Sequence, residues 1–165
     1  MAASKGWLAR VSVLLDAAPP KGDAARRSPH FSLRAYPYVL YDLVLYIPRM
    51  LMNVNGRGVA AARAVYPDIA LTDTLLVHDE LQRAFGKVSF KQGGSAAGHN
   101  GVKSVQHHLG NDVPRIRIGI DRPLDGNVSA YVLGSMPPDW LETCAHGEVL
   151  ERLWSTLQTW CLSRT

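Results

Sequence analysis

Three short polar clusters in the sequence combine residue types that can do chemistry. Asn53 follows an apolar pair, His78-Asp79-Glu80 closes an apolar run, and Gly98-His99-Asn100-Gly101 comes after a glycine-rich stretch. Carboxylates, imidazoles and amides are the side chains that orient water, hold a peptide backbone or move a proton near neutral pH. Each cluster follows a predicted strand, and sheets bind ligands where their strands end, so we expect the clusters to meet at one site.

Two further segments alternate in polarity, as half-buried strands do. Residues 86–92 put Lys91 on the polar face, and residues 115–120 put Arg115 and Arg117 on the polar face with isoleucines turned inward. Ammonium and guanidinium groups bind phosphate, so Lys91 and Arg117 are candidates for an anion site. A solvated sheet face is the simpler interpretation of the pattern by itself.

The segment Gly-Gly-Ser-Ala-Ala-Gly at 93–98 predicts a mobile loop that leads into a helix over 100–109. Exposed amides and the helix dipole at such a start favour an anion. His99 either supports the site by hydrogen bonding or is a structural histidine near the helix start. Asn53 and Asn100 have an alternative role as caps of the helices that follow them.

Periodicity predicts an α/β fold, with one domain over residues 1–165 and a mixed twisted sheet flanked by helices. The expected helices are 5–17, 53–66 (capped by Asn53 or Asn55), 100–109 and a last helix from Pro138-Asp139 whose apolar face is Leu150, Leu153, Trp154, Leu157 and Cys161. The expected strands are 31–36, 42–47, 74–78, 86–92 and 115–120, with a loop over 18–29 and a turn over 36–41.

The charge is concentrated at one end of the sequence. Residues 1–35 hold six basic and two acidic residues, which accounts for the whole net charge of +4, so any anion site must come from local placement. This basic start indicates an amphipathic helix more than an organelle transit segment. The apolar run Leu43–Pro48 is too short to cross a membrane and is typical of a buried strand. Cys144 and Cys161 are expected on one helix, roughly 25 Å apart and unpaired, as in a reducing compartment.

Five stretches together carry a resemblance to a known family. They are Leu51-Met52-Asn53-Val54-Asn55-Gly56, Val77-His78-Asp79-Glu80-Leu81, Phe90-Lys91 through Gly98-His99-Asn100-Gly101, Arg115-Ile116-Arg117-Ile118-Gly119-Ile120, and Val128 to Gly134. In this order and spacing, over residues 43–134, they resemble the peptidyl-tRNA hydrolases of the bacterial type. The resemblance implies cleavage of the ester that joins a peptide to the 3′ ribose of tRNA, without metal or organic cofactor.

The resemblance also implies roles for individual residues. Asp79 and Asn100 match catalytic positions, and Met52, Asn53, His99 and Asn100 match substrate-binding positions. Lys91 and Arg117 match positions that meet tRNA phosphates, while Ser89 stands where the family often has a second lysine. The implied partner is tRNA or peptidyl-tRNA. The expected state is a monomer in the cytoplasm or in mitochondria, with no membrane association.

One part of the family pattern is not found in the sequence. The family has an amino-terminal strand and loop, roughly Gly-Leu-Gly-Asn-Pro-Gly and then Thr-Arg-His-Asn, whose histidine activates water. Nothing before Met52 matches it, so Asp79, which would orient that histidine, is expected to face a gap, and a central strand of the sheet is expected to be missing. His78 precedes Asp79 on a strand and should point to the opposite face, so a substitute base is not expected.

Two functions remain open from the sequence. One is the family's hydrolysis of peptidyl-tRNA, with this chain a partial product that is inactive by itself. The other is a non-catalytic relative that binds tRNA or intron RNA. A metal site at His78, Asp79, Glu80 and His99 is not expected, because adjacent strand residues cannot all face one ion.

Overall fold

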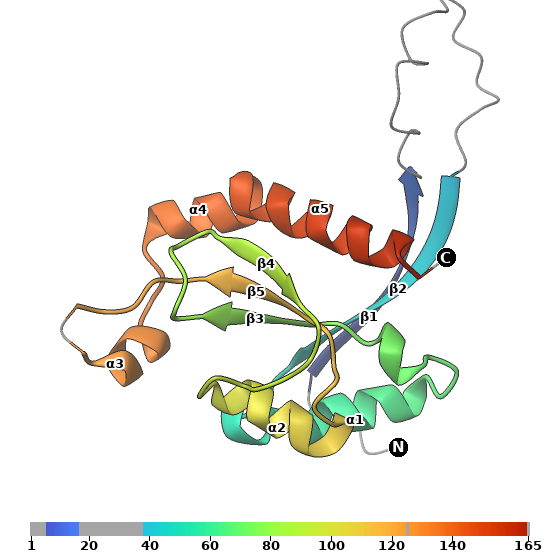
Figure 1. The fold of residues 1–165 in the computed structure, drawn as a ribbon, viewed down its shortest axis with the longest axis horizontal. Helices are drawn as coiled ribbons and strands as arrows, with labels where there is room; N and C mark the ends of the chain where they lie inside the picture. The colour runs from blue at the N-terminus through green and yellow to red at the C-terminus, as the bar shows by residue number, and fades with distance from the viewer. Residues whose placement is uncertain (1–5, 17–37, 125, 165) are drawn as a thin grey trace, which may run out of the picture.

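The computed structural model describes residues 6–16, 38–124 and 126–164. In chain order the elements are β1 (Gly6–Asp16), β2 (Tyr38–Pro48), η2 (Met52–Val54), α1 (Asn55–Val65), η3 (Leu71–Asp73), β3 (Leu76–Glu80), β4 (Val88–Lys91), α2 (Asn100–Leu109), β5 (Arg115–Gly119), α3 (Val128–Leu133), α4 (Pro138–His146) and α5 (Glu148–Leu162). Helices α4 and α5 run along one side of a three-stranded sheet, and α1 and α2 lie on its other side (Figure 1). Within the described ranges, no helix has the length and apolar character needed to span a membrane.

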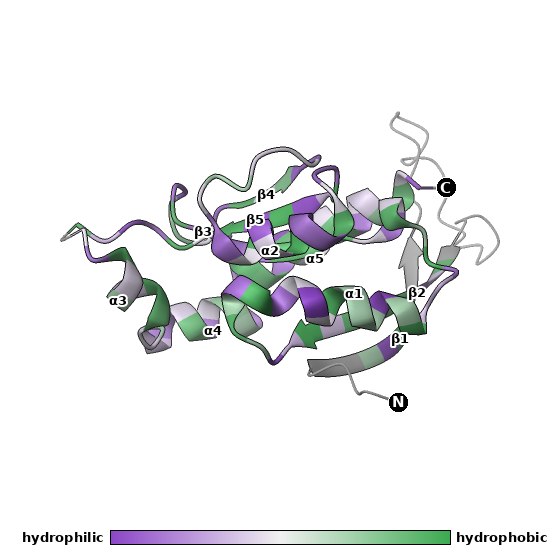
Figure 2. Cartoon of the chain, turned by 90° about the horizontal axis from the view of Figure 1, so that it is seen from below, coloured by the Kyte–Doolittle hydropathy of each residue, from purple (hydrophilic) through white to green (hydrophobic). Residues whose placement is uncertain are grey.

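The three-stranded sheet confirms the predicted mixed α/β fold. Its order is β3-β5-β4, with β3 parallel and β4 antiparallel to β5. His78 lies opposite Arg117, and Lys91 lies opposite Arg115. Residues directly opposite one another share a face of a sheet, so these four residues project from the same face. Hydrophilic and hydrophobic residues follow one another along β5, as the alternation predicts (Figure 2).

The predicted helix over residues 5–17 is wrong, because this segment forms strand β1. It pairs antiparallel with β2 from Gly6↔Pro48 to Asp16↔Tyr38. The spacing of its apolar residues also fits a strand, and pairing along the whole of β2 satisfies backbone groups that would otherwise need a helix. The predicted turn is wrong from Tyr38 onward, where β2 begins. The predicted elements at 18–29 and 31–36 lie outside the described residues.

The two-stranded ribbon of β1 and β2 is less buried than the sequence predicts. Pro48 ends β2 as expected, but Leu45 and Ile47 are 51% and 63% exposed, so a fully buried strand is a wrong prediction for this run. The ribbon is tied to the last helix, because the Tyr41 hydroxyl donates to the carbonyl of Cys161 at 2.8 Å. An ion pair between Arg10 and Asp42 joins the two strands.

A pair of closely packed helices, α1 and α2, supports the polar clusters. A Cβ on Gly56 would lie 2.0 Å from the carbonyl oxygen of Ser104, so only glycine permits this approach. The Gly56 N–H also donates to the Ser104 hydroxyl at 3.0 Å. Neither Asn53 nor Asn55 caps α1: the N-cap is Val54, without a side-chain bond, and the 3-10 turn before it satisfies the first donors.

The carboxy-terminal region forms two helices instead of the single predicted helix. Gly147 leaves the helical conformation between α4 and α5, with φ −110° and ψ −158°. Cys144 therefore lies on α4 and Cys161 on α5, and both thiols are free. On α5 the predicted apolar face is only partly buried: Cys161 is buried, but Leu150 and Trp154 are exposed.

The core beneath the sheet fixes the positions of α2 and β5. It consists of the buried side chains of Val105, Leu109 and Val113, with Val59 and Leu76 packed against them. Helix α2 keeps its predicted bounds and ends before Gly110, whose φ is +85°. Burial of these aliphatic side chains, at about 1.5–3 kcal/mol each, holds the start of α2 near the end of β3.

Candidate functional site

The carboxylate of Asp79 contacts the ring of His99. Asp79 is the last residue but one of the edge strand β3, and His99 is the N-cap of α2. Oδ1 of Asp79 lies 3.0 Å from Nε2 of His99. Nδ1 of His99 accepts the backbone N–H of Val102 at 3.2 Å, so the ring proton must be on Nε2 and is donated to Asp79. One oxygen of Asp79 thus contacts His99 while the Asp79 side chain is still 32% exposed, so the gap expected beside Asp79 stays a prediction.

This hydrogen bond favours the charged form of the carboxyl group. The bond from His99 is the largest cause that lowers the pKa of Asp79 below its ordinary value, and it outweighs partial burial, which acts in the other direction. Asp79 therefore stays ionised around neutral pH and holds His99 in one tautomer.

His78 lies beside the same ring. Its Nδ1–H donates to the carbonyl of Asp79 at 2.6 Å, and its ring meets the ring of His99 edge-on, with centroids 4.9 Å apart. Burial lowers the pKa of His78 to about 4, so its imidazole is neutral. The Nε2 atom of His78 is buried and has no hydrogen-bond partner in the part of the chain that the structure describes. Although His78 and Asp79 alternate along the strand, both thus contact His99.

The turn η2 brings the first polar cluster to the start of α2. A Cβ on Gly101 would lie 2.9 Å from Cγ of Met52 and 3.0 Å from Cε1 of His99, so Met52 and His99 flank this glycine. Asn53, in the same turn, and Asn100, the first residue of α2, are both exposed. Asn100 does not cap α2, because His99 does. Both asparagine amides are therefore accessible to a ligand.

Lys91, Arg115 and Arg117 form the basic face of the sheet, but Arg115 differs from its prediction. It was expected to point into solvent, yet it is 2% exposed and its guanidinium lies under the glycine-rich loop. Lys91 donates from Nζ to the carbonyl of Ser95 at 3.2 Å. Partial burial and the neighbouring guanidinium groups of Arg115 and Arg117 lower the pKa of Lys91.

Arg117 lines a hollow of about 330 Å³ at the far end of the basic face. The charged residues around it are Glu80, Arg83, Lys87 and Arg117. Burial, and then the positive charge of Arg83, lower the pKa of Arg117. Positive charge thus exceeds negative charge here, which favours an anionic ligand.

The structure brings together most of the site residues that the sequence predicts. Several residues that contact them were not predicted. Met52, Asp79, His99 and Asn100 meet around the start of α2, while Lys91 and Arg117 lie on the adjacent sheet face. Asn53 instead lines a hollow with Arg57 and the α2 residues His107 and His108. The contacts of His78 and the lining residues Arg83 and Lys87 were not predicted, since they depend on the turn after β3. In the described ranges, no group of three or more His, Cys, Asp or Glu is arranged to hold a metal ion.

Comparisons with known proteins identify the family of this chain. A family model described as Peptidyl-tRNA hydrolase matches residues 25–164. A peptidyl-tRNA hydrolase of Pelobacter propionicus is 46% identical over 100 residues, which cover 60% of this chain and 51% of that protein. A probable peptidyl-tRNA hydrolase of Mus musculus is 48% identical over 100 residues, covering 59% of this chain and 48% of that protein.

Solved structures give a matching result at the level of the fold. The crystal structure of peptidyl-tRNA hydrolase from Acinetobacter baumannii superimposes with a TM-score of 0.56 and 30% identity, over 72% of this chain and 64% of that chain. The chain spans about half the length of the curated relatives that it matches.

Proposed function

Because the chain belongs to the peptidyl-tRNA hydrolase family, we propose that it binds peptidyl-tRNA and acts as a carboxylic ester hydrolase on the bond between peptide and tRNA. The observation that carries this proposal is the link from Asp79 through His99 to the first turn of α2. This link fixes the helix start that bears Asn100, and the neighbouring Gly101 lies beside the side chains of Met52 and Asn55.

We assign the chemistry at this site to neutral amides that are positioned by the hydrogen-bonded pair of Asp79 and His99. Asp79 orients His99, and His99 holds the start of α2, so Asn100 is presented in one position. Its amide can hold a water or the ester carbonyl without adding charge. Asn53 and Met52 bind the peptide on the neighbouring turn. The site uses no cofactor in this proposal.

Lys91 and Arg117 bind phosphates of the RNA in this proposal. Both project from one sheet face adjacent to the site, and Arg83 and Lys87 add positive charge around Arg117. A guanidinium grips phosphate with two donors and an ammonium attracts it as a point charge. The protein acts as a monomer, in the cytoplasm or in mitochondria.

A second candidate is an RNA-binding protein without hydrolysis, and one observation favours it. Both ring nitrogens of His99 are already bonded, and His78 is neutral, with one nitrogen bonded and the other buried. Neither of these two histidines can accept a proton from a water in the described arrangement. Amides and phosphate-binding residues serve binding equally well.

The two candidates are separated by incubating the 165-residue protein with a peptidyl-tRNA. Peptide release and tRNA binding are measured in parallel for the wild type, Asn100→Ala and the control Asn111→Ala, which removes an exposed amide at the other end of α2. We expect hydrolysis that Asn100→Ala reduces by about 100-fold or more and that Asn111→Ala leaves unchanged. Binding without hydrolysis would support the second candidate, and absence of both would contradict the two together.

A further inference from the structure

Arg115 makes an unusual set of contacts for a strand residue. One terminal nitrogen of its guanidinium donates to three successive carbonyls, at 2.9 Å to Gly93, 2.7 Å to Gly94 and 2.7 Å to Ser95. The side chain is 2% exposed, and among the described residues it forms no ion pair with a carboxylate. Its charge is thus compensated at contact distance by the backbone carbonyls of the loop, and at longer range by the carboxylate of Glu80.

The loop is bent around Arg115 in a way that only glycine tolerates. Gly93 and Gly94 have φ of +54° and +79°, and a Cβ on Gly93 would lie 2.8 Å from Cα of Asp112. Two further bonds hold Gly94: its N–H donates to the carbonyl of Asn111 at 2.8 Å, and its carbonyl accepts from the Gln106 amide at 2.6 Å. The segment predicted as mobile from its composition therefore has a specific anchor.

The direction of the carbonyls determines what the loop presents outward. In a trans peptide the N–H points opposite to the C=O of the same unit. Because the carbonyls of Gly94 and Ser95 point at Arg115, the N–H groups of Ser95 and Ala96 point away from it, and neither has a partner among the described residues. Four residues later the chain reaches His99 and Asn100.

We propose that Arg115 is a positioning residue: its guanidinium holds the loop over 93–95 from beneath, so that the loop offers backbone N–H groups to an RNA phosphate and sets the entry to the start of α2. This inference rests on the proposed function. Arg115 itself touches no ligand in this assignment, unlike Lys91 and Arg117. A lysine cannot replace it, because its side chain is shorter and does not bring the ammonium within hydrogen-bonding distance of all three carbonyls beneath the loop.

Hydrogen exchange of the free protein tests the anchor without any RNA. The variants are Arg115→Met and Arg115→Lys, the second of which keeps the charge and most of the volume. We expect the Gly94 amide, bonded to Asn111, to exchange at least about tenfold faster in both, because the loop opens more often. The Gly119 amide, bonded to the carbonyl of Lys87 at 2.9 Å, is the control and should keep its rate. Equal acceleration at both amides, an unchanged Gly94 rate, or wild-type behaviour of Arg115→Lys would overturn the proposal.

The effect on ligand binding is measured with deacylated tRNA over a range of salt concentrations. If the loop over 93–95 is ordered in only about a tenth of the molecules of a variant, the apparent affinity of that variant for tRNA falls about tenfold. The slope of log affinity against log salt should stay unchanged in Arg115→Met, which removes the charge, because no phosphate contact is lost. A slope reduced by about one would mean that Arg115 binds phosphate directly, and would overturn the positioning role. If the wild type binds no tRNA, the proposed function fails, and the exchange experiment still decides the role of Arg115.

Discussion

At the residue scale, the candidate site depends on one histidine whose two nitrogens have different tasks. His99 donates from Nε2 to Asp79 and accepts at Nδ1 from Val102. The carboxylate of Asp79 fixes the tautomer and the ring orientation of His99. The family resemblance implies the same role for Asp79, but toward the histidine of the amino-terminal segment. The fixed ring then determines where Asn100 lies, so the chemistry of the amide depends on a charge that never touches the ligand.

His78 makes stability depend on pH in a defined window. Its folded-state pKa is lowered to about 4 by burial, so on acidification from about 6.5 to about 4 the unfolded chain binds a proton that the folded protein does not. Stability therefore falls with falling pH across this window, by about 2 kcal/mol for a partly exposed group. Asp79, whose pKa is lowered, loses its contribution only below its ordinary value of 3.8.

The measurement is the free energy of unfolding by urea at pH 7 and pH 4.5. The variant His78→Gln keeps a donor for the Asp79 carbonyl. In this variant, the free energy of unfolding should differ less between pH 7 and pH 4.5 than in the wild type, by most of the about 2 kcal/mol attributed to His78. His146→Gln, at an exposed position, is the control and should behave like the wild type. If the free energy of unfolding of His78→Gln differs between the two pH values as much as that of the wild type, other groups cause the loss of stability in acid.

At the element scale, the site is held by the close approach of α1 to α2. Gly56→Ala places a methyl group 2.0 Å from the Ser104 carbonyl, which is backbone and cannot move alone. Gly101→Ala meets mainly the side-chain ends of Met52, His99 and Asn55, at 2.9 to 3.1 Å. We expect Gly56→Ala to lower the free energy of unfolding by about 3 kcal/mol and Gly101→Ala by about 1 kcal/mol.

Urea unfolding at pH 7 ranks the two variants. Ser104→Ala is the matched control for Gly56→Ala, because it removes the hydrogen bond to the Gly56 N–H without adding a clash, and should cost only about 1 kcal/mol. If Gly56→Ala and Ser104→Ala lower the free energy of unfolding equally, helices α1 and α2 can move apart with little loss of stability. The contact of α1 with α2 would then not fix the site.

The sequence predicts an element correctly when the spacing of its apolar residues fits only one type of secondary structure. Helix α2 was predicted to the residue, because its apolar spacing and Gly110 agree. Strand β1 was mistaken for a helix, because apolar residues at 8, 11, 14 and 15 recur at helical spacing, whereas those at 7, 9, 11, 13 and 15 alternate as in a strand. The partner strand β2 is also remote in sequence. Arg115 was placed in solvent by alternation, which does not reveal that a loop more than 20 residues earlier covers that face. The Asp79–His99 pair is equally non-local: the sequence grouped the two at one site because both follow predicted strands, but it did not predict the hydrogen bond between them.

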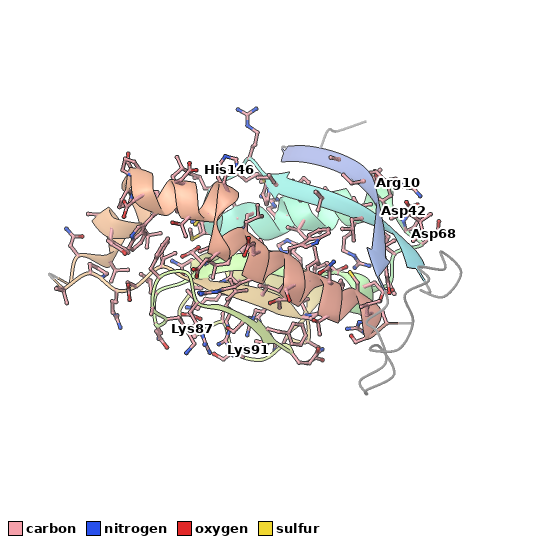
Figure 3. The ribbon with its side chains drawn as sticks, turned by 90° about the horizontal axis from the view of Figure 1, so that it is seen from above. Arg10, Asp42, Asp68, Lys87, Lys91 and His146 are labelled. Carbon is pink, nitrogen blue, oxygen red and sulfur yellow. The ribbon has the colours of Figure 1, made fainter. Side chains whose placement is uncertain are left out.

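At the scale of the whole molecule, positive charge is distributed unevenly between the sheet and the ribbon. Figure 3 places Lys87 and Lys91 well apart from Arg10 and Asp42, which lie on the ribbon of β1 and β2. The ribbon arginine is paired, whereas the basic face has an excess of positive charge. RNA should therefore be attracted to the face that borders the candidate site.

Replacement of single cations tests this placement. Lys91→Gln and Arg117→Gln should each weaken tRNA binding and reduce the slope of log affinity against log salt by about one, since each removes one phosphate contact. Arg10→Gln is the control for an arginine that is paired and remote, and should leave the slope unchanged. If all three variants behave alike, attraction is due to net charge and not to this face.

The bond between Tyr41 and Cys161 also has a consequence for the time course of folding. Its two ends are 120 residues apart, and the ribbon is tied to the last helix through it. A ribosome that adds about 5–20 residues per second needs roughly 6–24 s to reach Cys161 after making Tyr41. For that interval the Tyr41 hydroxyl lacks its partner on α5, so the ribbon is not yet joined to the last helix. A nascent chain with an unanchored two-stranded ribbon is prone to pair with other strands, so the interval before Cys161 is synthesised carries a risk of aggregation.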